Sequence, residues 1–320
     1  MKNIGAAGQR VLLSLVLLSG VNSCCAQSVN FNLQKLGDGV WTAVVSDSGT
    51  AGGNAGFVVG DDSIAVIDTF QDAGAARELL AAIRQISSLP IRFVVNTHYH
   101  LDHVAGNQVF ASAGAVVIAH RNVRAWARTE NLKFWGDAIK PEDKALVQAL
   151  KLPDVIYDDH LELYLGKRML QVRFLRGHTG GDSVLYVPDA RVLFCGDLLW
   201  KDHLPNLIDA STDKWIATLD LLSQDYAEST LVPGHGSVAQ PHDVAVFKDY
   251  LVSLREVVRQ AQLERTSDDA LVNAILPGLK EKYGTWGFFD DFAKTNILQT
   301  AHELAGDKRV PQPAGSGAKP

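Results

Sequence analysis

The sequence predicts an α+β fold in which two β-sheets pack face to face and helices cover their outer sides. Two observations predict it: strand-like runs lead into an amphipathic helix in the first half of the chain, and the same order returns in the second half. The 320 residues are 47% hydrophobic, which excludes a disordered or collagen-like chain and leaves ample apolar sequence for a core. The formal net charge of -6 indicates no basic surface, so no nucleic-acid partner is expected.

Residues 1–26 have the composition of a secretory signal peptide. Two basic residues precede an apolar run at 11–18, and small or polar residues follow as far as Ala26. The run is too short to cross a bilayer, so no membrane span is expected. Cleavage after Ala26 would give a free protein, whereas cleavage before Cys24 would leave a lipid anchor. Both routes predict an exported protein, periplasmic or secreted.

One domain is expected at 27–309, and strands dominate its first half. They are expected at Val40–Val45, 56–59, Ile64–Ile67 and 91–95. The first three read as an antiparallel meander, and the Gly-rich stretch at 46–54 predicts a flexible loop between the first two. Apolar residues from Ala76 to Ile86 recur at helical spacing, so a helix is expected before the fourth strand.

The second half repeats this pattern. Strands are expected at 161–165, 169–175, Ser183–Val187, 192–195 and 229–232. A helix is expected around Trp215, and a regular apolar stripe from Phe247 to Ala261 predicts a long amphipathic helix that covers a sheet. Two shorter helices follow it, and the Pro-containing tail at 310–320 is expected to be disordered.

The decisive motif lies at 97–103, where three histidines and an aspartate fall close together: His98, His100, Asp102 and His103. Imidazole nitrogen and carboxylate oxygen are the usual zinc ligands where thiolates are absent. In an extended loop His98 and His100 project to the same side. Asp102 and His103 come a turn later and can serve a second, adjacent ion.

Three further candidate ligands follow predicted strands by one to three residues, each directly after a glycine. They are His178, Asp197 and His235. Rigid strands whose ends converge can hold ligands in place, and glycine permits a tight turn and close backbone approach. We therefore expect four strand ends to deliver ligands to one rim.

Together these motifs, H-x-H-x-D-H, G-H-T-x-G, G-D and P-G-H-G, resemble those of the metallo-β-lactamase superfamily from about residue 40 to 235. The resemblance implies a four-layer αβ/βα sandwich with a two-metal site at one edge. It assigns His98, His100 and His178 to the first metal, Asp102, His103 and His235 to the second, and Asp197 to both. The remaining histidines match no motif position and are expected to be surface or core residues: His120, His160, His203, His242 and His302.

Two adjacent divalent ions can lower the pKa of a shared water towards neutrality, so the expected nucleophile is a metal-bridging hydroxide. Zinc is the expected metal, with manganese or iron as alternatives. Asp102 and Asp197 are the expected catalytic residues, and the Cys195 thiol is expected to point into the core. Asp68 is either a partner for a ligand histidine or a turn residue.

The predicted reaction is hydrolysis of an acyl bond in a small molecule, with a β-lactam as the first candidate substrate. The segment 201–210 resembles a β-lactamase stretch in which Lys201 and Asn206 would bind the substrate carboxylate and carbonyl. Against this, an Asp at 197 resembles thioesterases, lactonases and phosphodiesterases, so a lactonase or thioesterase is the alternative. From another class, the chain could be a non-catalytic metal-binding protein or a diiron redox protein.

Two segments are expected to border the metal site. The Gly-rich loop at 46–54 would overhang the metals as a flexible flap. The stretch 121–150 would form the opposite wall and supply apolar contacts from Trp126, Phe134 and Trp135.

Overall fold

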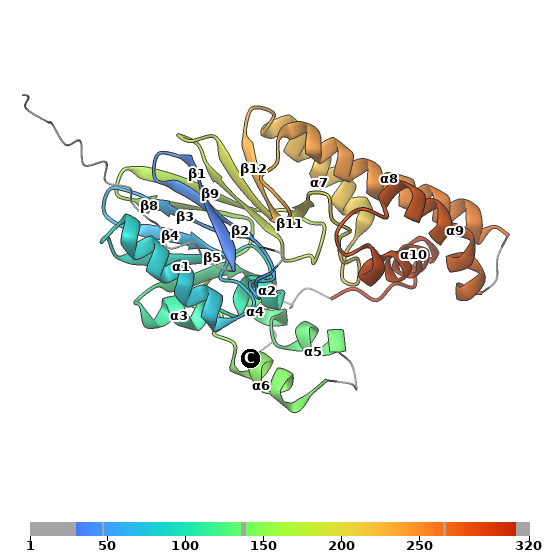
Figure 1. Cartoon of the computed structure of the whole chain (residues 1–320), viewed down its shortest axis with the longest axis horizontal. Coiled ribbons are helices and arrows are strands. Elements are labelled where there is room, and N and C mark those ends of the chain that lie inside the picture. The colour runs from blue at the N-terminus through green and yellow to red at the C-terminus, as the bar shows by residue number, and fades with distance from the viewer. Residues whose placement is uncertain (1–29, 47, 136–138, 265–266, 312–320) are drawn as a thin grey trace, which may run out of the picture.

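Two β-sheets pack face to face, with helices on both outer sides (Figure 1). The computed structural model describes residues 30–46, 48–135, 139–264 and 267–311, so the expected signal peptide and nearly all of the expected tail lie outside them. The α+β class and the four-layer sandwich are confirmed. None of the described helices combines the length and the apolar composition that crossing a bilayer requires.

The first sheet has seven strands in the order β1-β2-β3-β4-β5-β6-β7. They are β1 (Phe31–Gly37), β2 (Val40–Val45), β3 (Ala55–Val59), β4 (Ile64–Ile67), β5 (Ile91–Asn96), β6 (Val116–His120) and β7 (Val155–Tyr157). β1 to β4 pair antiparallel, so the meander predicted for β2 to β4 is confirmed, and β1, which was not predicted, extends it. β4 to β7 pair parallel, because helical crossovers carry the chain back between these strands.

The second sheet has five strands in the order β12-β11-β10-β9-β8. They are β8 (His160–Leu165), β9 (Arg168–Phe174), β10 (Ser183–Val187), β11 (Val192–Trp200) and β12 (Thr230–His235). Only β11 and β12 pair parallel, through the crossover helix α7 (Thr212–Asp225). β11 runs five residues beyond the predicted strand, so Asp197 lies within it. A register shift at Gly196, whose φ is +51°, turns the strand there.

Helices complete the outer layers and one end of the molecule. Those between β4 and β7 are α1 (Ala73–Ile86), α2 (Leu101–Val104), α3 (Asn107–Ser112), α4 (Arg121–Trp126), α5 (Thr129–Trp135) and α6 (Pro141–Ala149). Those after β12 are α8 (Pro241–Gln262), α9 (Asp268–Tyr283) and α10 (Phe289–Ala305). The last three lie together at the right-hand end of Figure 1.

Buried apolar residues form a layer on each side of each sheet. One cluster packs α1 residues such as Leu79 and Ile83 against the first sheet. A second, with Val58 and Leu185, lies between the two sheets. A third packs α7, α8 and α10 against the outer face of the second sheet, and Trp215 is fully buried there. The predicted apolar stripe of the long helix is therefore confirmed as a core face.

The C-terminal helices also hold the loop that follows β11. Asn296 on α10 is fully buried. Its amide nitrogen donates to the Pro205 carbonyl at 2.8 Å and to the Tyr250 hydroxyl at 2.9 Å, and its amide oxygen accepts from the Leu207 N–H at 3.2 Å. Lys308 donates to the carbonyls of Leu207 and Ala210, at 2.6 Å each. This loop is thus anchored by residues about ninety positions further along the chain.

We expect Asn296→Ala to lower the free energy of unfolding by about 2–4 kcal/mol, because it leaves buried backbone groups without partners. Urea unfolding followed by circular dichroism measures this change. Lys294→Ala, at an exposed position of the same helix, is the matched control and should stay within about 0.5 kcal/mol of the unsubstituted protein. Equal effects of the two substitutions would refute the anchoring role of Asn296.

Candidate metal centre

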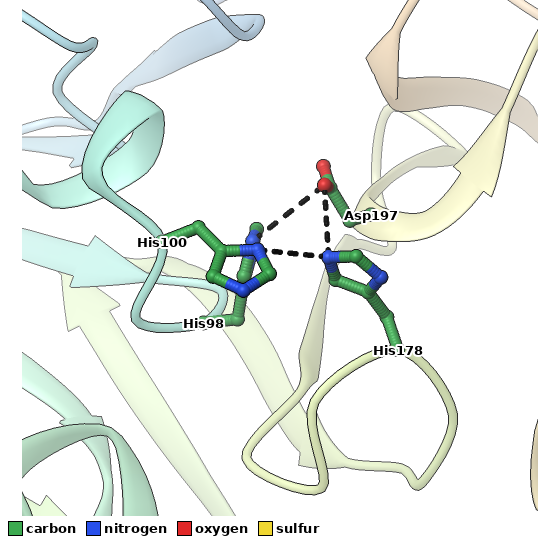
Figure 2. A group of neighbouring side chains, drawn as sticks. All are labelled: His98, His100, His178 and Asp197. Carbon is green, nitrogen blue, oxygen red and sulfur yellow. Dashed lines mark hydrogen bonds and ion pairs between the residues drawn. The ribbon is translucent and has the colours of Figure 1, made fainter. Parts of the chain in front are cut away.

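Four of the predicted ligands form one compact group: His98, His100, His178 and Asp197. His98 and His100 follow β5, His178 lies in the loop after β9, and Asp197 comes from β11. The Asp197 Oδ2 lies 3.6 Å from His98 Nε2 and 3.2 Å from His178 Nε2, and His178 Nε2 lies 3.0 Å from His100 Nδ1 (Figure 2). The two sheets thus contribute to one ligand set, as predicted.

The other predicted ligands form a second group beside the first: Asp102, His103 and His235. His235 Nε2 lies 3.2 Å from Asp102 Oδ2 and 3.4 Å from Asp197 Oδ2. His103 Nε2 lies 3.1 Å from Asp197 Oδ1. The carboxylate of Asp197 therefore lies between the two groups, where it could hold two ions at once.

The donor atoms fit a metal. His98 Nε2, His103 Nε2 and Asp197 Oδ1 are buried and have no hydrogen-bond partner among the described residues. A buried polar atom without a partner costs about 1–3 kcal/mol, so three of them pointing into one space indicate a group bound between them. Nitrogen and carboxylate donors without thiolates suit zinc, and they also suit manganese or iron.

Charge in the site is balanced between carboxylates and imidazoles. Burial opposes ionisation of Asp197, but His235, His103 and His98 outweigh it and hold the pKa of Asp197 well below its ordinary value. Burial also opposes protonation of His235, but the Asp197 and Asp102 carboxylates outweigh it and raise the pKa of His235 to about 9. Burial lowers the pKa of His98 well below its ordinary value, so that imidazole is neutral and ready to bind a metal.

Asp68, for which the sequence left two roles open, contacts a ligand. Its carboxylate accepts hydrogen bonds from the Thr97 N–H at 2.8 Å and the Thr97 hydroxyl at 2.7 Å, and it lies 2.8 Å from His103 Nδ1. This leaves the Nε2 of His103 facing Asp197. Asp68 therefore orients a ligand histidine, in a strained backbone conformation with φ of +56°.

The sequence analysis missed Asp209. Its Oδ2 accepts from the Tyr99 hydroxyl at 2.6 Å and lies 3.8 Å from His100 Nε2. Tyr99 itself is fully buried. The 110 positions between Tyr99 and Asp209 left no local pattern, and the only available signal was that Asp209 lies in the segment 201–210.

The second half of the loop expected at 46–54 lies against the ligands, since Gly52 is beside Asp102 and Gly53 is beside His103, but it is not a loose flap. The side-chain oxygen of Asn54 accepts from the Val45 N–H, and its side-chain nitrogen donates to the carbonyls of Pro233 and Gly236. Its backbone N–H donates to the Gly234 carbonyl. These bonds tie the loop to the end of β12, which carries His235. The Gly residues that suggested flexibility instead permit close approach to the ligands.

A cavity of about 340 Å³ opens over the ligands. Apart from the ligands it is lined by Gly52, Gln71, Leu101, Glu130, Asn131, Lys133, Trp200, Asn206, Ile208, Asp209, Phe288 and Phe292. The stretch 121–150 does reach the cavity, but with polar residues of α5. Trp126 is instead buried against Tyr99, and the side chains of Phe134 and Trp135 lie outside the described part of the structure.

The two predicted substrate residues have different positions. Asn206 lines the cavity, and its side-chain oxygen accepts from the Ile208 N–H at 2.9 Å. Lys201 is not at the rim as expected. Its Nζ lies 3.2 Å from Asp243 of α8 and donates to the Val238 carbonyl, while its backbone N–H donates to the His235 carbonyl at 3.1 Å.

The remaining predictions concern residues outside the ligand set. Cys195 is buried in the core as predicted, and burial raises the pKa of its thiol, so it offers no nucleophile. The five other histidines belong to neither ligand group. His120 stacks on Phe174 at 3.9 Å, which is the structural role expected of it.

Comparisons with known proteins extend this description. Residues 48–235 match the family described as "Metallo-beta-lactamase superfamily". A linear primary-alkylsulfatase from Pseudomonas sp. (strain ATCC 19151) is 24% identical in an alignment of 275 positions that covers 70% of this chain. A hydroxyacylglutathione hydrolase from Methylococcus capsulatus is 26% identical over 185 residues, or 57% of this chain. The matches span 52% and 63% of those two relatives' own lengths.

Solved structures share the fold. A metallo-beta-lactamase from Pontibacter korlensis aligns with a TM-score of 0.57 at 22% identity, over 69% of this chain and 99% of its own. The structure of VMB-1 aligns with a TM-score of 0.56 at 20% identity, over 71% and 99%. Both alignments leave about three tenths of this chain uncovered.

We expect Gly53→Ala to weaken metal binding by the second group and leave the first group intact. A Cβ at Gly53 would lie 2.7 Å from His103 Nε2, which is closer than packed atoms come. Metal titration by calorimetry should show one of two equivalents weakened by at least about 10-fold. Gly278→Ala, where a Cβ meets nothing within 4 Å, is the control and should leave both equivalents unchanged.

We also expect metal binding to release protons at pH 7. A ligand imidazole must be neutral, and the pKa of His235 is raised from 6.5 to about 9, so affinity should increase as pH rises towards 9. In chelated protein, the stability from protonated His235 is complete below about pH 6.5 and lost as pH rises through 9. Calorimetry in buffers of different ionisation enthalpy measures the release, and none at pH 7 would contradict the charge balance described above.

Proposed function

This chain belongs to the metallo-beta-lactamase superfamily, as its motifs predicted, and on that premise we propose that it is a two-metal hydrolase that cleaves an ester-type acyl bond in a small molecule. Membership and the His/Asp cluster support a metal-dependent hydrolase. The observation that carries the finer proposal is the position of Asp197 between the two ligand groups. That carboxylate could hold two ions close enough to share one substrate.

Two bound divalent ions would supply Lewis acidity and lower the pKa of a water towards neutrality. The chain's own residues would bind and orient. Asp68 and Asp209 hold the rings of His103 and His100, so that the ligand nitrogens face the site. Asn206 lies on the cavity wall, where its amide can donate to a carbonyl oxygen that gains negative charge. Asp102, on the cavity lining beside His235, can accept the proton of the attacking water.

The position of Lys201 bears on the substrate. Its ion pair with Asp243 leaves it off the cavity, so the cation that favoured a carboxylate-bearing β-lactam does not face the ligands. Lys133 is the one described Lys or Arg on the cavity lining, and it is paired with Glu130. A substrate with little negative charge therefore suits this cavity lining better than a carboxylate-bearing one does. We therefore favour an ester, lactone or thioester, and the hydroxyacylglutathione hydrolase among the relatives agrees with this class.

A sulfate ester is the second candidate. The match to the linear primary-alkylsulfatase covers 70% of the 320-residue chain, about 224 residues, which is more than the 188 of the family segment, so the likeness includes sequence outside the shared core. Export from the cytoplasm, expected from residues 1–26, is also part of the proposal. Fractionation of cells that produce the full chain tests it, because export would place the protein outside the cytoplasmic fraction.

The decisive experiment compares four substrates with the purified, metal-loaded protein: a thioester, a lactone, a chromogenic cephalosporin and an alkyl sulfate. We expect the thioester or the lactone to be hydrolysed fastest, with activity lost on chelation and restored by Zn²⁺. Asp197→Ala should lower kcat/KM by more than about 100-fold and reduce metal content, because it removes a ligand common to both groups. Asp38→Ala, whose side chain is fully exposed, is the matched control and should leave both unchanged.

Each alternative has its own outcome. Fastest turnover of the cephalosporin or of the sulfate would replace the acyl-ester proposal with that substrate. A protein that binds two ions and hydrolyses none of the four would favour a non-catalytic role. Oxidation of a bound iron pair by oxygen, without hydrolysis, would favour the redox alternative.

A further inference from the structure

Three aromatic residues form one wall of the cavity beside the second ligand group: Trp200, Phe288 and Phe292. Trp200 stacks on the ligand His235 with ring centroids 3.9 Å apart and planes 21° apart. Phe288 meets both rings edge-on, with centroids 6.0 Å from Trp200 and 5.6 Å from His235. Phe292 continues the wall at 5.8 Å from Phe288. An apolar surface thus adjoins the atoms expected to perform the chemistry.

Phe288 is held there by backbone contacts and not by burial. Its neighbour Gly287 donates its N–H to the Asp202 carbonyl at 2.8 Å and accepts from the Leu204 N–H at 2.8 Å. These bonds tie the start of α10 to the loop after β11. The chain at Phe288 has a φ of +59°, a conformation that is rare for a large side chain. Strain of this kind, of order 1–3 kcal/mol, persists where the surroundings impose it, often at a binding site.

The exposure of Phe288 is the second observation. Phe288 is 38% exposed, whereas Phe289, the next residue of the same helix, is 6% exposed and belongs to the core. Its ring contacts Trp200, His235 and Phe292, and these contacts leave part of it open where it lines the cavity. Leu101 and Ile208 also line the cavity, together with the polar residues of α5. Ligand cavities commonly combine such an apolar wall with a few polar groups that orient the ligand.

We propose that Phe288, with Trp200 and Phe292, binds an uncharged aryl or alkyl group attached to the scissile bond and so determines substrate selectivity. This inference rests on the proposed function, because it names the substrate class for the same site. Phe288, at the N-terminus of α10, and Phe292, within α10, lie outside the segment 48–235 that matches the family. Two of the three residues proposed to determine selectivity therefore lie in a part of the chain that the family segment does not contain, whereas Trp200 lies within that segment.

Two series of esters test the proposal. One varies the acyl group with a fixed leaving group, from acetyl to hexanoyl and phenylacetyl, and the other varies the leaving group of an acetate from methyl to phenyl. The unsubstituted protein should prefer the apolar members. Phe288→Ala should lower kcat/KM for the preferred apolar substrate by about 10-fold and leave its acetyl or methyl counterpart within about 2-fold.

Two further variants separate the ring from the backbone. Phe288→Asn keeps a residue that tolerates positive φ and should lose selectivity as Phe288→Ala does. Val246→Ala removes an exposed apolar side chain of α8 that does not line the cavity, and it should retain the full preference. Metal content should be the same in all of these variants. A preference preserved in both series by Phe288→Ala, or a parallel fall for all substrates, would overturn the proposal.

Binding measured without turnover separates this inference from the proposed function. Phenylacetate should bind the metal-loaded protein more tightly than acetate, and Phe288→Ala should remove most of that difference in calorimetry. If the unsubstituted protein hydrolyses no ester, the proposed function fails, and phenylacetate binding still tests the aromatic wall. If esters are hydrolysed but phenylacetate and acetate bind equally, the wall proposal fails and the hydrolase proposal stands.

Discussion

The Asp197 carboxylate lies 3.1–3.6 Å from the ring nitrogens of four buried histidines, and the surrounding structure is arranged to make this possible. A buried carboxylate is costly unless cations or donors surround it. Here histidines of both ligand groups surround the Asp197 carboxylate. The backbone at Gly234 also approaches Asp197 closely, because a Cβ there would lie 1.8 Å from Asp197 Oδ1. No side chain larger than glycine fits at 234 while Asp197 keeps this position.

This constraint connects the two sheets. The first sheet delivers His98, His100, Asp102 and His103 from the end of β5, and the second delivers His178, Asp197 and His235. The ligands meet only if the sheets keep their relative position, which the apolar layer between them maintains. Asn54, hydrogen-bonded both to β2 at Val45 and to the end of β12 at Pro233, adds a polar tie beside the site. Core packing and ligand geometry are therefore parts of one arrangement.

The C-terminal helices act on the site through the loop that follows β11. Asn296 and Lys308 bond the backbone of that loop, and Gly287 joins it on its other side. The loop carries Asn206 and Asp209 on the cavity lining, while the start of α10 supplies Phe288. The family segment thus holds the predicted ligands, whereas the helices beyond it shape the surface that a substrate would meet. Variation in these helices could change selectivity without disturbing the ligands.

The sequence by itself predicted the candidate ligands and the layered fold, because short-range patterns and the motifs that resemble the family's indicate them. His98, His100, Asp102 and His103 are close in sequence, and the stripe from Phe247 to Ala261 follows the period of one helix. Only the tertiary structure decided which residues support the ligands and where flanking side chains point. Asp68 reaches His103 across 35 positions, Asp209 reaches Tyr99 across 110, and Lys201 turns to Asp243 across 42. Each of these contacts depends on how distant segments of the chain pack together. Such contacts leave no repeating local pattern in the sequence, so the sequence could not predict them.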